Sequence, residues 1–226
     1  MVLGLGAAGC GGGSEASSTT APASEHKITV AGDSISVGLG SQLREVLARS
    51  DDPATVVKVI GEPGTGLARP DNFDWPRRIE ELARDHPPQV LVFSVGSNDA
   101  QDLTDSSGAV VATMAQRDRW DDEYRKRLAA VFDAFDPAAG HGSTKVVWVG
   151  HVRTAQSRVA ETNRRVQRLA AEAAASRPWV VVEDLAGLLG TGEQPATRCL
   201  AADGLHLVPA CLREADEQLL GPLGRG

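Results

Sequence analysis

Apolar residues recur along this chain in five short runs, separated by longer segments whose apolar positions repeat at helical spacing. The run at residues 89–95 is apolar almost throughout, as expected for a strand that is covered on both faces of a sheet. The runs predict five strands, at residues 28–31, 55–60, 89–95, 145–149 and 179–182. The segments between and after them predict five helices, at residues 37–49, 75–85, 119–135, 155–176 and 209–220.

Strands that alternate with helices form βαβ units, whose strands lie parallel and whose crossovers are right-handed. The predicted fold class is therefore α/β, a three-layer α/β/α sandwich around a five-stranded parallel sheet. The chain of 226 residues is long enough for one well-buried domain, which we place at residues 27–226. Ligands bind at the carboxyl ends of the strands in such sheets, so polar motifs that follow strands are the first candidates for a site.

Residues 1–26 do not fit this pattern and form a separate predicted segment. The start is small and apolar and ends in Ala-Ala-Gly-Cys, which resembles a truncated lipoprotein signal whose lipid is carried by Cys10. A run rich in Gly, Ser, Thr, Ala and Pro follows, with the composition of a flexible tether. We expect an extracytoplasmic protein anchored to the cell membrane through Cys10. The alternatives are a secreted protein without this anchor and a tail with an incidental cysteine.

Composition and charge exclude several classes of partner. A hydrophobic share of 42% with 23% charged residues is ordinary for a soluble domain. The net charge of −7 argues against nucleic acid, which needs a clustered basic surface, and against electrostatic attachment to anionic lipid. No stretch of the sequence approaches the roughly 18 apolar residues of a spanning helix, so membrane contact is expected only through Cys10.

Two polar motifs follow the first and third predicted strands. Gly-Asp-Ser at residues 32–34 places Ser34 at a strand-to-helix turn, where its hydroxyl is exposed and its backbone N–H could face an oxyanion. Gly-Ser-Asn-Asp at residues 96–99 offers the Asn98 side-chain amide as a second donor. Taken alone, the first motif is better explained as a helix N-cap and the second as a turn.

A third motif, Asp-Gly-Leu-His at residues 203–206, lies after the fifth strand and before the last helix. A carboxylate three residues before a histidine can orient the imidazole and stabilise its cation, although a solitary motif of this kind is usually a surface loop. All three motifs occur in order at the carboxyl ends of predicted strands. Their conjunction resembles the SGNH hydrolase family, also called GDSL esterases, over nearly all of residues 27–220.

The resemblance implies a flavodoxin-like fold and a set of site residues. Ser34 would be the nucleophile, His206 the general base and Asp203 the carboxylate that orients it. The oxyanion hole would consist of the Ser34 backbone N–H, a glycine N–H and the Asn98 side chain. Gly66 is favoured for the glycine over Gly64, because residues 65–71 (TGLARPD) and 74–76 (DWP) are similar to a bacterial subgroup in which the glycine before Leu has this role.

The resemblance also implies a function, a serine esterase or deacylase that needs no cofactor. Its substrate would be a small-molecule or glycan ester, and a short acyl group on a carbohydrate or lipid of the cell envelope is favoured. The single Tyr and four Phe offer little material for a sugar-stacking platform, and this low aromatic content favours a short acyl group. Two alternatives stay open, an O-acyltransferase to a glycan that uses the same triad and an inactive module that binds a glycan or a partner.

Cys199 and Cys211 bracket the third motif. In an oxidising compartment we expect them to form a disulfide that holds the acid–base loop, and the alternative is two buried reduced thiols. The histidines outside that motif lack Cys, Asp or Glu at ligand spacing, so no metal is predicted. His151 and Arg153 follow the fourth strand, where each would either contact substrate at the rim or be a plain loop residue.

Three further predictions concern single side chains. Arg69 and Trp75 are candidates for lining the cleft, although a Trp at a helix start more often packs in the core. His26 is assigned to the tether. The arginines of the fourth predicted helix are expected to form a solvated face, at positions 158, 164, 165 and 168.

Overall fold

A computed structural model describes Met1 and residues 26–49, 55–140 and 143–224. Its main sheet has five strands, all parallel, in the order β2-β1-β3-β6-β7. The strands are β1 (His26–Gly32), β2 (Thr55–Gly61), β3 (Val90–Ser94), β6 (Lys145–Gly150) and β7 (Val180–Asp184). This order is that of the flavodoxin-like doubly wound sheets, and the predicted fold class is confirmed.

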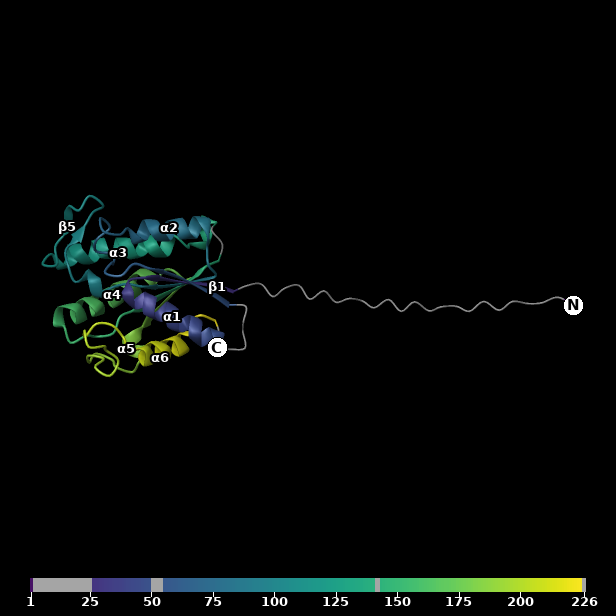
Figure 1. Cartoon of the computed structure of the whole chain (residues 1–226). Coiled ribbons are helices and arrows are strands. Elements are labelled where there is room, and N and C mark those ends of the chain that lie inside the picture. Colours follow the sequence, from purple (N-terminus) through teal and green to yellow (C-terminus); the bar gives the residue numbers. More distant parts are fainter. Residues whose placement is uncertain (2–25, 50–54, 141–142, 225–226) are drawn as a thin grey trace.

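Helices cover both faces of the sheet, as Figure 1 shows. One layer consists of α2 (Trp75–Asp85), α3 (Arg117–Asp133) and α4 (Ser157–Ala174). The other consists of α1 (Ser34–Ala48), α5 (Leu185–Leu188) and α6 (Pro209–Leu219). The molecule is therefore the predicted three-layer α/β/α sandwich.

The core is divided into two apolar clusters, one on each face of the sheet. Alternate residues of β3 belong to different clusters, since Leu91 and Phe93 pack with α2, α3 and α4 while Val90 and Val92 pack with α1 and α6. This alternation explains why the strand is apolar throughout, because both of its faces are buried.

Local sequence explains where the helices begin. Asp74 caps α2 by accepting the Arg77 backbone N–H at 3.1 Å, and Pro76 has the φ angle that a first turn requires. In the same way, Asp33 caps α1 by accepting the Ile35 N–H at 2.9 Å. Helix α1 therefore begins at Ser34, three residues before the predicted start.

Several short elements were not predicted. A two-stranded antiparallel sheet joins β4 (Leu103–Thr104) and β5 (Val110–Ala112) between β3 and α3. Single turns of 3₁₀ helix lie at η1 (Ser97–Asp99) and η2 (Pro137–Ala139), and α5 has four residues. Segments this short carry too few positions for a periodic pattern to reveal them.

The structure tests only part of the predictions for the N-terminal segment. Strand β1 begins at His26, so this histidine belongs to the sheet and not to the tether. The predicted tether and Cys10 lie outside the described residues. None of the helices in the described ranges is both long enough and apolar enough to cross a bilayer.

Strand order also positions the site. The chain leaves β1 for β2 on one side of the sheet and later enters β3 on the other side of β1. The connections therefore diverge at the carboxyl ends of β1 and β3, where sheets of this kind usually have the crevice that binds their ligand. Ser34 follows β1 and residues 96–99 follow β3, so both predicted motifs flank this crevice.

Candidate active site

The turn between β1 and α1 brings Ser34 to the sheet edge. Gly32 has φ +137°, and a Cβ at this position would overlap the carbonyl group of Ser94 on β3. The next residue, Asp33, donates its backbone N–H to the same Ser94 oxygen at 3.1 Å. Glycine is therefore required where β1 meets β3, and the tight turn places Ser34 in the first position of α1.

Asp203 and His206 lie on a short hairpin. Ala201 donates its backbone N–H to the His206 carbonyl at 2.7 Å, and Gly204 makes the turn with φ +69°. One oxygen of Asp203, Oδ1, accepts the backbone N–H groups of Leu205 and His206, at 2.9 and 3.0 Å. Its other oxygen is therefore left for the imidazole.

The structure brings the three predicted triad residues together. Asp203 Oδ2 is 2.7 Å from His206 Nδ1, and His206 Nε2 is 2.8 Å from Ser34 Oγ across 172 positions of sequence. The hydrogen bond from His206, together with the two backbone N–H groups, lowers the pKa of Asp203 to about 2. The carboxyl is therefore ionised at neutral pH, as the orienting member of a triad must be. The predicted third motif does not directly follow its strand, because α5 and a loop separate it from β7.

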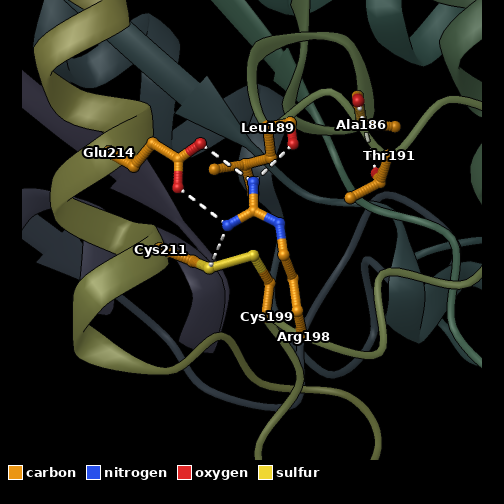
Figure 2. Close-up of a disulfide and its surroundings, with 7 residues drawn as sticks. All are labelled: Ala186, Leu189, Thr191, Arg198, Cys199, Cys211 and Glu214. Carbon is orange, nitrogen blue, oxygen red and sulfur yellow. Dashed lines mark hydrogen bonds and ion pairs between the residues drawn. A yellow bond between two sulfur atoms is a disulfide. The ribbon is translucent and has the colours of Figure 1, made fainter.

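A disulfide closes the loop that carries this pair. Cys199 and Cys211 are bonded, with their Cα atoms 5.5 Å apart, which confirms the predicted pairing. Figure 2 shows the Arg198 guanidinium beside the bridge, where it donates to both Glu214 oxygens at 2.9 Å and to the Leu189 carbonyl at 2.7 Å. The loop is thereby tied to α6 and to the end of α5.

The other two predicted site residues lie on neighbouring turns. Asn98 Nδ2 donates to the Thr65 carbonyl at 2.9 Å and to Asp33 Oδ2 at 3.2 Å, so Asn98 connects the turn after β3 with those after β2 and β1. A Cβ on Gly66 would overlap the Asp99 carboxylate, whereas a Cβ on Gly64 would meet no atom within 4 Å. Close approach therefore requires glycine at 66, the position that the motif favoured.

The segment that follows Gly66 is held from two sides. Asp99 accepts the Ala68 backbone N–H at 2.6 Å and the Tyr124 hydroxyl at 2.7 Å. Arg127 donates to the carbonyls of residues 67, 68 and 104, at distances of 2.6–3.1 Å. Burial raises the pKa of Asp99 to about 6. Sequence analysis missed these holding residues, although Tyr124 lies on the apolar stripe of a predicted helix.

Two residues considered for the cleft have other surroundings. Trp75 is fully buried and donates its indole N–H to Thr65 Oγ1 at 2.9 Å, so it packs behind the Gly66 turn. Arg69 forms a bidentate pair with Asp71, at 2.8 and 2.6 Å. The Arg-Pro-Asp part of the predicted motif therefore contains an ion pair that shapes this turn.

Three basic residues are buried, which their predictions did not include. His151 lies in the loop after β6, as predicted, but not at the rim, because it is buried against Ser97 and Ser94. Arg153 is also buried, and its guanidinium lies 3.2 Å from Asp184. Arg165 does not belong to the solvated face, since its guanidinium lies over the Trp120 ring, 4.2 Å from the ring centroid.

Burial perturbs two further groups at the crevice. It raises the pKa of Asp33 to about 7, against the opposing effect of the hydrogen bond from the Ile35 N–H. It lowers the pKa of His151 to about 4. Among the described residues, no group of three or more His, Cys, Asp or Glu side chains is placed to hold a metal ion. At this edge a hydroxyl, an imidazole and a carboxylate are joined by hydrogen bonds.

Comparison with known proteins agrees with this architecture. A family model described as "Protein of unknown function (DUF459)" matches residues 27–217. No curated protein gives a match to the chain.

Solved structures similar in fold are SGNH/GDSL hydrolases and related esterases. A member of the lipolytic protein G-D-S-L family from Veillonella parvula is 17% identical with a TM-score of 0.60, covering 89% of this chain and 100% of that one. LAE5, an alpha/beta hydrolase from the metagenome of Lake Arreo in Spain, is 16% identical with a TM-score of 0.63, covering 90% and 97%. Axe2, an acetyl xylan esterase from Geobacillus stearothermophilus, is 16% identical with a TM-score of 0.59, covering 89% and 95%.

Proposed function

The chain belongs to the family described as "Protein of unknown function (DUF459)", and from the geometry of its site we propose that it is an SGNH-type serine hydrolase that cleaves carboxylic esters. The observation that carries the proposal is the continuous hydrogen-bonded series from Asp203 through His206 to Ser34, with distances of 2.7 and 2.8 Å. A nucleophile within reach of a base that is itself oriented by a carboxylate is the arrangement that activates a hydroxyl.

The proposed reaction has two stages. Ser34 Oγ attacks the ester carbonyl while His206 Nε2 takes its proton, and the resulting tetrahedral intermediate expels the alcohol, which receives that proton from His206. Water then attacks the acyl-enzyme with His206 again as base, which releases the carboxylic acid and restores the Ser34 hydroxyl. Asp203 stays ionised and holds the proton of the imidazole on Nδ1, so that Nε2 faces Ser34.

The proposed oxyanion hole consists of the backbone N–H groups of Ser34 and Gly66 and the side-chain amide of Asn98. The need for a side-chain-free residue at 66 supports this assignment over Gly64. The position of Asn98 also supports the assignment, because its side-chain amide donates to Asp33, the residue directly before the nucleophile. In the resting state this amide donates to Asp33 and Thr65, and an oxyanion would attract it as a stronger acceptor.

Exposure of the triad favours hydrolysis over transfer to a sugar. The side chains of His206 and Asp203 are 43% and 52% exposed. An acyltransferase has to keep water away from its acyl-enzyme, and this site is open to water. An inactive binding module has no need of a base 2.8 Å from a serine hydroxyl.

The open site also bears on the substrate. It can accept an acyl group carried on a large alcohol, and a short acyl ester of a cell-envelope carbohydrate or lipid is the substrate class we propose. The fold likeness to an acetyl xylan esterase is consistent with this class. We further propose that the catalytic domain is held outside the cytoplasm by a lipid on Cys10 and the tether that follows. Membrane fractionation of the wild type and of Cys10→Ser in a bacterial host tests the anchor, which the variant should lose.

Steady-state hydrolysis of p-nitrophenyl acetate and longer p-nitrophenyl esters tests the activity. The Ser34→Ala variant is the control, and Ser36→Ala is matched to it because Ser36 is a buried serine on the same helix that donates its hydroxyl to the Asp33 carbonyl. We expect turnover that disappears with Ser34→Ala and persists with Ser36→Ala. Equal turnover in wild type and Ser34→Ala would refute the proposal, and acceleration by added sugar acceptors would shift it to a transferase.

A further inference from the structure

A buried histidine that the proposed mechanism does not use lies beneath the site. His151 follows β6 and is 3% exposed. Its imidazole contacts Ser97 on the turn after β3 and Ser94 at the end of β3, and its Nε2 is 3.8 Å from Asp33 Oδ1. One side chain from the loop after β6 therefore touches the turn that carries the proposed oxyanion donor Asn98 and approaches the residue before the nucleophile.

The hydrogen bonds fix the tautomer of His151. The Ser97 backbone N–H points at Nδ1 at 3.2 Å, and a backbone N–H can only donate, so Nδ1 carries no proton. The proton is therefore on Nε2, which donates to Ser94 Oγ at 3.1 Å. Ser94 in turn donates its hydroxyl to the Val149 carbonyl at 2.8 Å. Each donor in this series has an acceptor.

A second residue completes the support of the Ser97 turn. Asn163 of α4 donates its amide to the Val152 carbonyl at 2.9 Å and to Ser97 Oγ at 3.2 Å. The Ser97 hydroxyl has two acceptors within reach, His151 Nδ1 at 2.7 Å and Asn163 Oδ1 at 3.3 Å, and the shorter distance favours donation to His151. Ser97 is thus held to His151 through both its backbone and its side chain, and Asn98 is the next residue in the chain.

We propose that His151 is a positioning residue of the oxyanion hole, which as a neutral imidazole accepts from Ser97 at Nδ1 and so fixes the turn that aims the Asn98 amide. This inference rests on the proposed function for its effect on catalysis. A displacement of about 1 Å in such a donor is enough to cost on the order of a hundredfold in rate.

Burial keeps His151 in the form that this role requires. It lowers the pKa of His151 to about 4, Asp184 acts in the opposite direction and His206 acts in the same direction. Asp33, which lies 3.8 Å from Nε2, is the carboxyl that approaches the ring most closely. The imidazole is therefore neutral near pH 7, and its acceptor at Nδ1 is available there.

Three variants separate this role from general support of the core. His151→Leu keeps an apolar volume but removes the acceptor, and kcat should fall by about tenfold or more with KM little changed. His151→Asn places its Oδ1 near the position of Nδ1, and it should restore kcat to within about threefold of wild type. Val147→Ala is the matched control, since it opens a cavity on the preceding strand β6 outside this hydrogen-bonded series and should lower the unfolding temperature without lowering kcat.

A double-mutant cycle tests whether the effect passes through Asn98. Asn98→Ala alone should lower kcat by about 10²–10³. Adding His151→Leu to Asn98→Ala should cost less than about twofold more, because the donor that His151 aims is already gone. Losses that multiply in full, or a His151→Leu variant as active as Val147→Ala, would overturn the proposal.

A readout without catalysis separates this inference from the proposed function. In ¹⁵N NMR spectra of the full chain, His151 should show an unprotonated Nδ1 and a protonated Nε2 at neutral pH. The Asn98 side-chain amide should give one ordered pair of resonances that is lost in His151→Leu and regained in His151→Asn. An absence of ester hydrolysis in wild type would defeat the proposed function alone, whereas an Asn98 amide unchanged in His151→Leu would defeat the positioning role.

Discussion

Asp216 lies on the buried face of α6, the helix that follows the acid–base loop and packs against α1, which begins with Ser34. Neither of its carboxylate oxygens has a hydrogen-bond partner among the described residues. Burial alone raises the pKa of this carboxyl from its ordinary 3.8 to about 8. We expect replacement of Asp216 by Asn to stabilise the fold by an amount that grows with pH.

The size of this effect follows from proton linkage. In the unfolded chain the carboxyl ionises above pH 3.8, whereas in the folded chain it stays protonated up to about pH 8. The folded state therefore binds more protons in this window, and the stability of the wild type falls by about 1.4 kcal/mol per pH unit on account of this group. By neutral pH the accumulated cost is about 4 kcal/mol, and Asn does not pay it because its side chain does not titrate.

Urea unfolding followed by tryptophan fluorescence measures the difference. The free energies of unfolding of Asp216→Asn and wild type should diverge by about 1.4 kcal/mol per unit between about pH 4 and about pH 8, and then level off. Glu217→Gln is the matched control, because Glu217 is exposed on the same helix and its difference from wild type should stay within about 0.5 kcal/mol at every pH. The test is the change of this difference with pH and not its absolute value. The Asn amide also needs hydrogen-bond partners in a buried position, which shifts the difference equally at every pH.

A difference between Asp216→Asn and wild type that does not change with pH would refute the reasoning. It would mean that the folded protein ionises Asp216 as easily as the unfolded chain does, either through a partner or through access of water. A difference that shrinks with rising pH would mean that the ionised carboxylate stabilises the fold.

Three other substitutions test the site directly. Asp203→Asn should lower kcat on p-nitrophenyl acetate by about a hundredfold or more with little change in KM, because the amide cannot hold the required imidazole tautomer; equal kcat would contradict the triad. Gly66→Ala should abolish most turnover because its Cβ would overlap the Asp99 carboxylate. Gly64→Ala should keep turnover and lower the free energy of urea unfolding by only about 1 kcal/mol, because Gly64 has a φ of +79°. The reverse pattern would move the oxyanion role to Gly64. Replacing Cys199 and Cys211 by Ser should lower the free energy of unfolding by about 3 kcal/mol and change the pH–rate profile of ester hydrolysis, and an unchanged profile would show that the bridge does not hold the acid–base loop.

Much of this fold was predictable from the sequence, because its long elements are strongly periodic and well capped. The bounds of α2 follow from Asp74 and Pro76, and the apolar run of β3 follows from burial on both faces. Strands β4 and β5 were missed because two and three residues give no pattern. The start of α1 was placed three residues late because the predicted helix was begun at its periodic apolar residues, although the first motif already offered Asp33 as an N-cap.

The candidate site was likewise predictable from the sequence in part only. The contact of Asp203 with His206 is local, and the position of Ser34 at the sheet edge follows from the rule that carboxyl ends of parallel strands meet there. The approach of His206 to Ser34 does not follow from this rule, because α5 and a loop separate the third motif from β7. The burial of His151 could not be predicted, because its partners are 54 and 57 positions away in sequence. Arg165 was misplaced for a similar reason, since the Trp120 ring that it covers belongs to another helix.

Covalent labelling of Ser34 tests the central claim most directly. The full chain is treated with a small organophosphorus ester such as diisopropyl fluorophosphate, and the modified residue is located by peptide mass spectrometry. The account predicts a single adduct on Ser34 that is absent from Ser34→Ala and forms far more slowly in His206→Gln, because the imidazole 2.8 Å away activates the hydroxyl. An adduct on another residue, or labelling of Ser34 at the same rate in His206→Gln, would contradict the assignment of this triad.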